Sequence, residues 1–486
     1  MDLLDRISRT AHEYPEKLAH VSEDRTLTYA ELAQKSDALA RHFAGAFPAG
    51  HAPVAVIGHK EPEMLIAFLG AVKSGRPYVP IDVAIPARRA AGMLQASQAV
   101  VALTPSEIAA LANERSSAKP RRVGLNDPFY IIFTSGSTGE PKGVVITLGC
   151  LTTFLEWMLE QHPFTRGRET FLNQAPFAFD LSVMDLYLSL ATGGTLFSIG
   201  KNEIANPKRL YSALDHSTVT VWVSTPTFAQ MCLIERRFNR TMLPQLRRFL
   251  FCGETLAPDT VAQLLDRFPE AEIWNTYGPT EATVACTSVR IDRDMLARYA
   301  PLPVGAPMPG AKVLVVDGEG QPVTPGERGE IIIAGAHVSP GYVGSPDLAN
   351  SGFFWMGNLR AYRTGDWGRI ENGLLFFEGR IDAQFKINGY RIELGDVEEN
   401  LRSLPTVTDA AVLPVIRQGI AQSLAAFVVL SRRGGESDFE LGTRLRSELA
   451  QRIPAYMLPG RFIFVDAFPM TANGKTDRRR LADSIR

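Results

Sequence analysis

An unusual density of hydrogen-bond donors marks residues 133–143, which read FTSGSTGEPKG. This stretch holds three glycines, four hydroxyl side chains and one lysine, and it lies between the apolar runs FYII and VVI. Glycines let backbone N–H groups approach an anion closely, and hydroxyls and an ammonium add further donors. Pro141 before Lys142 departs from the common P-loop and keeps the lysine out of a helix. We therefore predict a phosphate-binding loop of another kind, with a surface hairpin rich in Ser and Gly as the alternative.

Six other motifs accompany this loop in a fixed order along the chain. They read LTYAEL at 27–32, SGRPYVPIDVAIP at 74–86, NTYGPTE at 275–281, YRTGD at 362–366, GRIDAQFKINGYRIE at 379–393 and NGK at 473–475. Together with the loop they resemble the motif set of the adenylate-forming superfamily, and specifically of amino-acid adenylation domains. The resemblance covers Leu27 to Lys475, and it implies an enzyme that activates a carboxylic acid with ATP.

The resemblance implies a nucleotide site built from several of these motifs. The residues that would hold the phosphates are Thr134, Ser135, Gly136, Ser137, Thr138 and Lys142, and those that would pack against adenine are Asn275, Thr276, Tyr277, Gly278, Pro279 and Thr280. Asp366 would accept the ribose hydroxyls, and Arg380 would contact the ribose or a phosphate. Glu281 would bind Mg²⁺, a hard cation that takes oxygen ligands. Taken alone, these motifs have ordinary alternatives: a structural turn, a solvated carboxylate, a self-capping Asp and a salt bridge at a domain boundary.

Lys475 is the residue to which the resemblance assigns the central catalytic role. It would reach the substrate carboxylate and the α-phosphate of ATP and neutralise charge while a carboxylate oxygen attacks phosphorus. Asp382 would be the hinge about which a C-terminal lid rotates between the two reaction steps. No general base is needed, because an amino-acid carboxylate is already ionised at neutral pH. The ordinary interpretation of this basic segment, a solvated tail, applies to Arg478 to Arg480.

Asp180, in the run FAFDLSVMDLYLSL, is the candidate partner for a substrate ammonium. An ammonium removed from water needs an ionic partner, whereas a helix N-cap is the alternative role for this aspartate. The stretches VSTPTFAQMCL, FCGETL, NTYGPTEATVACTS and IPAYMLP resemble the family of ligases that load D-alanine onto a carrier protein for teichoic acid synthesis in the cell wall. In that family, residues matching Cys252 and Val284 border the substrate methyl group. Simple core filling is the alternative for a buried cysteine.

The motifs leave other functions open. A freestanding enzyme for glycine or another small amino acid would share all of them. An acyl-CoA synthetase would share the ATP motifs without needing Asp180, and a nucleotide-binding protein without activity would keep them unused. Only eleven residues follow Lys475, so we expect the phosphopantetheine thiol to arrive on a separate carrier protein.

The elements that must position these residues follow an α/β pattern. Short β-rich runs such as PVAVIG, YVPID, FYIIFT and TVTVWVST alternate with helix-like stretches, which predicts layered, mainly parallel sheets in a large N-terminal body. Turn signals within about 304–370 predict a smaller β-rich subdomain or barrel there. We predict a body at 1–379 and a smaller α+β lid domain at 380–486.

Composition excludes several other classes of protein. With 486 residues, 45% hydrophobic residues and 21% charged ones, the chain should fold into two or three globular domains. Its net charge of -1 offers no overall field for nucleic acid or an anionic membrane. Four cysteines without C-x-x-C spacing argue against a disulfide framework and a zinc site. The sequence has neither a signal peptide nor a run of ~18 apolar residues, so we expect no membrane insertion and a cytoplasmic location.

Overall fold

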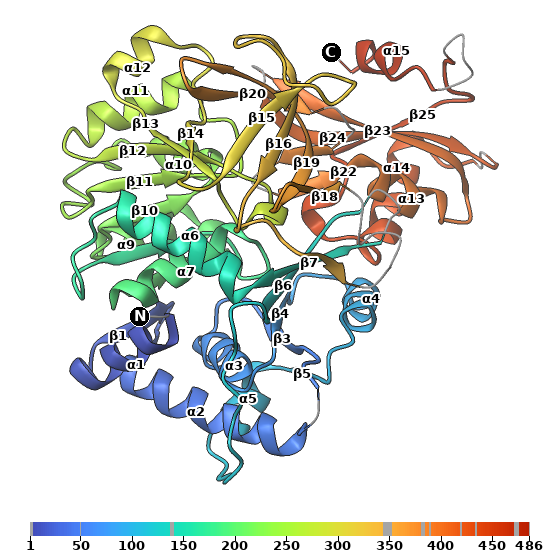
Figure 1. Cartoon of the computed structure of the whole chain (residues 1–486). Coiled ribbons are helices and arrows are strands. Elements are labelled where there is room, and N and C mark those ends of the chain that lie inside the picture. The colour runs from blue at the N-terminus through green and yellow to red at the C-terminus, as the bar shows by residue number, and fades with distance from the viewer. Residues whose placement is uncertain are drawn as a thin grey trace. The chain divides into compact units, whose positions relative to one another are not determined.

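The computed structural model describes residues 3–48, 50–136, 140–343, 352–380, 384–387, 390–417, 420–432, 435–470 and 476–485 (Figure 1). Four predicted site residues, Ser137, Thr138, Asp382 and Lys475, lie outside this description. The chain forms two compact units. Unit 1 comprises Met1–Asp82, Ala96–Ile132 and Gly143–Gly379, and unit 2 comprises Val83–Gln95, Phe133–Lys142 and Arg380–Arg486. Our domain boundaries, 1–379 and 380–486, stay a prediction.

A nine-stranded sheet forms one half of unit 1, in the order β14-β13-β12-β11-β10-β8-β9-β1-β2. Its strands are β1 (Leu18–Ser22), β2 (Arg25–Thr28), β8 (Thr170–Asn173), β9 (Thr195–Ser198), β10 (Val221–Ser224), β11 (Arg248–Phe251), β12 (Glu272–Tyr277), β13 (Thr287–Arg290) and β14 (Ala306–Pro307). The six strands from β12 to β1 are parallel, and antiparallel pairs finish both edges. The carboxyl ends of these parallel strands therefore share one edge of the sheet, as the sequence predicts for an α/β fold.

A six-stranded sheet follows the order β17-β7-β6-β4-β3-β5. Its strands are β3 (Val54–Gly58), β4 (Tyr78–Asp82), β5 (Val101–Leu103), β6 (Pro128–Thr134), β7 (Lys142–Thr147) and β17 (Gly341–Val343). β3 pairs in parallel with β4 and β5, and β4 pairs in parallel with β6. The glycine-rich loop connects β6 to β7, so a strand begins at Lys142 and no helix starts there. This confirms that the loop differs from a P-loop.

Helices cover these sheets. They are α1 (Leu3–Glu13), α2 (Tyr29–Ala46), α3 (Pro62–Lys73), α5 (Pro105–Leu111), α6 (Leu148–Gln161), α7 (Leu181–Thr192), α8 (Lys201–Ile204), α9 (Pro207–Asp215), α10 (Pro226–Leu233), α11 (Pro258–Arg267) and α12 (Arg293–Arg298). The LTYAEL motif starts α2, where Thr28 and Glu31 form a capping box. All twelve residues of α7 are buried, because the helix packs against β8, β9 and β10 as well as α1 and α6. A helix that is apolar on every side needs such a buried place.

Apolar side chains fill unit 1 in two clusters. The larger cluster connects both sheets and includes Phe68, Tyr78, Phe129 and Tyr187. The smaller one, around Trp222, holds Phe238, Phe249 and the buried faces of α10 and α11. No helix in the described part of the chain combines the length and apolar character that a bilayer span requires.

The predicted β-rich subdomain is a five-stranded sheet. Its strands are β15 (Lys312–Val316), β16 (Gly329–Ala334), β18 (Phe353–Met356), β19 (Leu359–Glu371) and β20 (Leu374–Arg380), in the order β15-β16-β19-β18 with β20 also on β19. Among the described residues these pairings leave the sheet open, which matches the β-rich subdomain that we predicted and not the barrel named as its alternative. The long strand β19 serves as the common partner of three others, and it carries the YRTGD motif.

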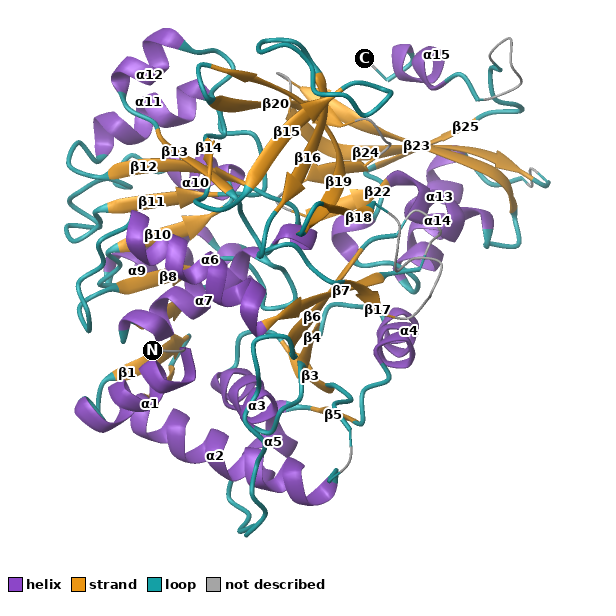
Figure 2. Ribbon diagram, viewed as in Figure 1, coloured by secondary structure: helices purple, strands orange, loops and turns teal. Residues whose placement is uncertain are grey.

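Unit 2 contains two further sheets and several helices (Figure 2). Its elements are α4 (Ala87–Ser97), β21 (Gln384–Ile387), β22 (Tyr390–Glu393), α13 (Leu394–Arg402), β23 (Val407–Arg417), β24 (Ile420–Leu430), α14 (Asp438–Ala450), β25 (Arg461–Phe464) and α15 (Arg478–Asp483). β21 and β22 form a hairpin, and β23, β24 and β25 form a mixed sheet. Val397, Leu401, Val412 and Leu445 lie in its apolar core.

Glu398 on α13 is the buried anion that connects the elements of unit 2. It is 4% exposed, and its carboxylate accepts hydrogen bonds from the backbone N–H of Val412 at 2.8 Å and from Arg478 at 3.0 Å. Arg402 lies 3.4 Å from the same group. A buried carboxylate is tolerated only with such donors, so α13, β23 and α15 are held to one another through this residue.

We expect Glu398→Ala to destabilise unit 2 by about 2 to 3 kcal/mol, because two arginines and a backbone N–H lose their acceptor. Native-state hydrogen exchange of the amides in α13 and β23 measures this change in the full chain. Glu399→Ala is the matched control. The Glu399 carboxylate also pairs with Arg402, but it is 56% exposed, so its removal should change the stability of unit 2 very little. Equal effects of the two substitutions would contradict the role given to Glu398.

Candidate active site

The predicted substrate and nucleotide residues of unit 1 follow the carboxyl ends of parallel strands. Asp180 lies in the connection from β8 to α7, and Cys252 comes directly after β11. Tyr277 ends β12, and Glu281 follows in the short helix η1 (Thr280–Ala282). Since β8, β11 and β12 are parallel members of one sheet, these side chains share its carboxyl edge, where open α/β sheets bind ligands.

Asp180 bonds to the nucleotide-type motif and not to its own helix. Its Oδ2 accepts a hydrogen bond from the Thr280 hydroxyl at 2.6 Å. Within the described chain its side chain makes no capping hydrogen bond with α7. The helix-cap alternative therefore does not describe this carboxylate, which lies half-buried beside Thr280.

Glu281 is a buried carboxylate held by two tyrosines. It is 1% exposed, and its Oε1 accepts hydrogen bonds from the hydroxyls of Tyr342 at 2.8 Å and Tyr362 at 3.1 Å. The alternative of a solvated surface carboxylate is thus excluded. Sequence reasoning missed both tyrosines as functional residues. The available signal was that Tyr362 opens the YRTGD motif, in which only Asp366 received a role.

Asp366 is 4% exposed, and its Oδ2 accepts a hydrogen bond from the Tyr277 hydroxyl at 2.5 Å. Burial, together with the charge of Asp366, raises the pKa of Tyr277 well above its usual value. Tyr277 therefore stays protonated and remains a donor at neutral pH. Its ring lies 6.0 Å from that of Phe377. The expected stacking of Tyr277 on adenine stays a prediction.

Two residues of the same strand contribute buried polar groups. The Thr276 hydroxyl donates to the carbonyl of Phe251 at 2.8 Å, and the Asn275 side-chain amide donates to the carbonyl of Pro303 at 2.8 Å. The other side-chain atom of Asn275, Oδ1, is buried and finds no hydrogen-bond partner in the described chain. Buried acceptors are rarely left unpaired, and an adenine amino group is a donor of the required kind. These residues fit a nucleotide.

The turn between β12 and β13 has an unusual backbone. Thr283 and Val284 have φ of 54° and 70°, a region that β-branched residues adopt only under constraint, at a cost of about 1–3 kcal/mol each. The Thr283 hydroxyl donates to the carbonyl of His337 at 2.6 Å, and Cys252 Sγ donates to the carbonyl of Val284 at 3.6 Å. A Cβ added to Gly278 would lie 2.6 Å from a backbone atom of the same turn, so only glycine fits there. The structure thus brings Cys252 and Val284 together.

The glycine-rich loop belongs to unit 2. The Ser135 hydroxyl donates to the carbonyl of Arg391 at 2.9 Å and accepts from the backbone N–H of Glu393 at 3.1 Å. Lys142 lies 3.8 Å from the Glu393 carboxylate. A Cβ on Gly136 would approach the carbonyl of Glu140 to 2.1 Å. Thr134 ends β6, and Arg380 ends β20.

Two other features concern metals and pockets. No group of three or more His, Cys, Asp or Glu side chains suited to a metal occurs among the residues that the structure describes. Glu281 could thus supply one carboxylate ligand, with phosphate oxygens and water as the others, which is the usual coordination of Mg²⁺.

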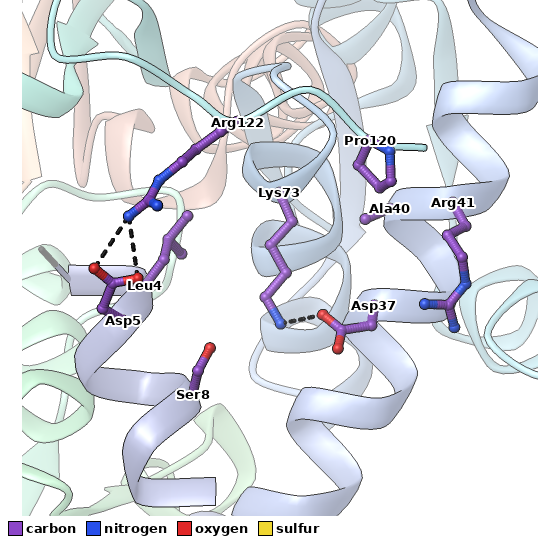
Figure 3. Close-up of a pocket in the computed structure, with 9 residues that line it drawn as sticks. All are labelled: Leu4, Asp5, Ser8, Asp37, Ala40, Arg41, Lys73, Pro120 and Arg122. Atoms are coloured by element: carbon purple, nitrogen blue, oxygen red, sulfur yellow. Dashed lines mark hydrogen bonds and ion pairs between the residues drawn. The ribbon is translucent and has the colours of Figure 1, made fainter. Parts of the chain in front are cut away.

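Figure 3 shows a pocket of about 280 Å³ in which Asp5 pairs with Arg122 and Asp37 pairs with Lys73. Of the predicted site residues in the described ranges, none lines this pocket.

Lys60 is a buried cation that sequence reasoning missed. Its ammonium donates to the carbonyls of Asn173 at 3.0 Å, Gln174 at 2.7 Å and Ile199 at 2.7 Å, and so supports the connection that carries Asp180. Burial lowers the pKa of Lys60 to about 7, and the Asp185 carboxylate opposes this shift. Only eleven of the 51 basic residues are lysines, but Lys60 stands between His59 and Glu61, so the local sequence carried no clear signal of its burial.

Comparison with known proteins gives a family match over most of the chain. The family described as AMP-binding enzyme matches residues 7–343, and the AMP-binding enzyme C-terminal domain matches residues 396–475. A protein of Bacillus mycoides (strain KBAB4) named D-alanine--D-alanyl carrier protein ligase is 43% identical over 503 residues, which cover 100% of both chains.

Solved structures with the same fold include two adenylation proteins. The Vibrio cholerae adenylation domain AlmE, in complex with glycyl-adenosine-5'-phosphate, superimposes with a TM-score of 0.85 at 22% identity over 99% of this chain and 97% of its own. Holo-PA1221, an NRPS protein containing adenylation and PCP domains, superimposes with a TM-score of 0.83 at 26% identity. The match covers 99% of this chain and 84% of its own. The predicted α/β fold of adenylate-forming enzymes, with a large N-terminal body and a smaller C-terminal domain, is confirmed.

We expect the tyrosine pair at Glu281 to act as a unit. Tyr342→Phe or Tyr362→Phe alone should destabilise unit 1 by about 1 kcal/mol, because the other hydroxyl still bonds the carboxylate. The double substitution should cost more than the sum of the two, since the buried charge then loses both donors. Urea denaturation of the four proteins measures this coupling, and Tyr14→Phe at an exposed site is the control. Strict additivity would show that the two hydroxyls do not act as a unit at Glu281.

Proposed function

The chain belongs to the AMP-binding enzyme family, and from that premise we propose that it is a ligase that activates D-alanine with ATP and loads it onto a separate carrier protein. The observation that carries this proposal is the hydrogen bond between Asp180 and Thr280. It joins a carboxylate suited to a substrate ammonium to the segment suited to a nucleotide. The full-length similarity to a ligase of this kind supports the same substrate.

The reaction proceeds in two steps, adenylation of the amino acid and then thioester formation. A carboxylate oxygen of D-alanine attacks the α-phosphorus of ATP, and the bond from that phosphorus to the bridging oxygen breaks, giving D-alanyl-AMP and pyrophosphate. The thiolate of a phosphopantetheine group on the carrier protein then attacks the carbonyl carbon. A thioester forms, and AMP leaves with the electron pair of the broken C–O bond. The thiol proton passes to solvent.

We assign the roles in substrate binding to groups from several motifs, of which Asp180 and Tyr277 follow or end strands at the carboxyl edge of the nine-stranded sheet. Asp180 pairs with the ammonium of the amino acid, an interaction that removal from water makes strong. Asn275 Oδ1 accepts a hydrogen bond from the adenine amino group. The Asp366 carboxylate accepts hydrogen bonds from the ribose hydroxyls, while its Oδ2 also accepts one from the Tyr277 hydroxyl. Arg380 contacts the ribose or a phosphate. The phosphates bind to the loop from Thr134 to Lys142.

Charge neutralisation is the main catalytic task, because the attacking carboxylate and the triphosphate are both anionic. Glu281 would hold Mg²⁺, which supplies positive charge to the phosphate oxygens. Lys475 adds a positive charge at the reacting carboxylate and the α-phosphate. We further infer rotation about Asp382 between the two steps, a gating motion of the kind that many closing enzymes use.

Cys252 and Val284 are the residues that would select the amino acid. Cys252, which follows β11, donates through its Sγ to the carbonyl of Val284 on the strained turn, and we propose that the two residues border the substrate methyl group. A single methyl group is worth only ~1–3 kcal/mol of discrimination, so glycine is the nearest competing substrate. The D-alanyl carrier protein would feed teichoic acid synthesis for the cell wall, and the supply of ATP favours the cytoplasm as the place of reaction.

We expect pyrophosphate release to be fastest with D-alanine in a panel that also contains L-alanine, glycine, D-serine, L-serine and a short fatty acid. Asp180→Asn should remove activity toward every amino acid, because the ammonium then lacks an anionic partner. Initial rates with a coupled pyrophosphate assay give both results. A preference for glycine would replace the substrate, and a fatty-acid activity that survives Asp180→Asn would favour an acyl-CoA synthetase.

Lys475→Ala should lower the rate of pyrophosphate release by roughly 10²–10³-fold, because one charged donor to the transition state is lost. The KM for ATP should change much less, since most nucleotide contacts belong to other residues. Arg480→Ala, in the same basic segment, is the control and should keep the wild-type rate. A Lys475→Ala enzyme with unchanged adenylation would show that another group carries this charge.

A further inference from the structure

Thr280 belongs to the segment suited to adenine, yet its hydroxyl bonds to the residue suited to the amino acid. The Thr280 side chain is 7% exposed and donates to Asp180 Oδ2 over 2.6 Å. This length is typical of a hydroxyl bound to an ionised carboxylate, which is among the stronger hydrogen bonds in proteins. The bond spans one hundred residues of sequence and joins the connection after β8 to the turn after β12.

The backbone that carries this hydroxyl is held from several directions. The carbonyl of Thr280 accepts from the N–H of Thr283 at 3.2 Å, and the carbonyl of Glu281 accepts from the N–H of Ser339 at 2.8 Å. Two residues before it, Gly278 packs against the backbone near Ala285 too closely for any side chain. Because these contacts fix η1, the Thr280 hydroxyl is a donor with one well-defined position.

The direction of the Asp180 carboxylate depends on a fixed donor such as the Thr280 hydroxyl. It stands at the first turn of α7 without a capping bond from its side chain to that helix, as far as the chain is described. A carboxylate can rotate about its side-chain torsions, and a bond to one oxygen fixes the direction of the whole group. An ordered carboxylate binds an ammonium better than a rotating one, since less conformational entropy is lost on binding.

We propose that Thr280 is a positioning residue for the amino-acid site, whose hydroxyl orients the Asp180 carboxylate toward the substrate ammonium. The inference rests on the proposed function, because it presupposes a substrate with an ammonium group. It also makes the two halves of the site interdependent, since the donor to Asp180 belongs to the segment that would bind the nucleotide. Coupling of this kind is reciprocal for the two ligands.

The test uses a matched pair of stable adenylate analogues. One is D-alanyl sulfamoyl adenosine, and the other is propionyl sulfamoyl adenosine, which lacks only the amino group. The ratio of their dissociation constants, measured by calorimetry, reports the ammonium site alone, because the nucleotide contacts cancel. We expect the wild-type protein to favour the amino analogue, and Thr280→Val to lower that ratio by about 10- to 100-fold, as loss of a hydrogen bond to a charged group predicts.

Controls separate positioning from loss of structure. Thr280→Ser keeps the hydroxyl and should restore most of the ratio. Thr192→Val removes an equally buried hydroxyl, which donates to the carbonyls of Leu188 and Ser189 in α7, and it should leave the ratio unchanged. In Thr280→Val the affinity for propionyl sulfamoyl adenosine should fall less than the affinity for D-alanyl sulfamoyl adenosine. Thr280→Ala is the second variant if the valine substitution lowers the unfolding temperature.

Each other outcome overturns a defined part of the account. An unchanged ratio in both Thr280→Val and Thr280→Ala would overturn the positioning role while leaving amino-acid activation intact. Equal loss of affinity for both analogues would show that Thr280 serves the nucleotide instead. A wild-type protein that does not favour the amino analogue would overturn the amino-acid substrate itself, and the positioning role with it.

Discussion

Three carboxylates meet hydroxyl donors around a single turn, and the arrangement of the whole site depends on these bonds. Tyr277 donates to Asp366 and Thr280 donates to Asp180, while Glu281 receives the hydroxyls of two tyrosines from the last third of unit 1. Carboxylates removed from water need hydrogen-bond donors. Hydroxyl groups meet that requirement and leave the net negative charge available to an ammonium and a metal.

The fold explains why one turn can reach all three carboxylates. Parallel strands place the ends of β8, β11 and β12 at the same edge, and the antiparallel return through β13 forces the chain to reverse within a few residues. That reversal is paid for with two β-branched residues at positive φ, Thr283 and Val284. Bonds to His337 and Cys252 hold this strained backbone, so Cys252 and the turn that carries Thr283 and Val284 are held to one another.

The sequence predicted what depends on local pattern and ordered motifs. The apolar runs FYII and VVI on either side of the glycine-rich loop are such local signals, and they form the strands β6 and β7. The pairing of Glu281 with Tyr342 and Tyr362 has no such signal, because residues distant in sequence meet only after the sheets assemble. The same holds for buried Lys60, and for the open β15–β20 sheet, whose closure depends on strand pairing that alternation alone does not specify.

Oxygen transfer from the substrate carboxylate tests the central claim most directly. D-Alanine labelled with ¹⁸O in its carboxylate would be incubated with MgATP and the protein, and the adenylate would be cleaved with hydroxylamine. Since a carboxylate oxygen bonds to the α-phosphorus, we predict that mass spectrometry finds one ¹⁸O in AMP and none in pyrophosphate. Unlabelled AMP, or ADP as the nucleotide product, would contradict activation of an amino acid at this site.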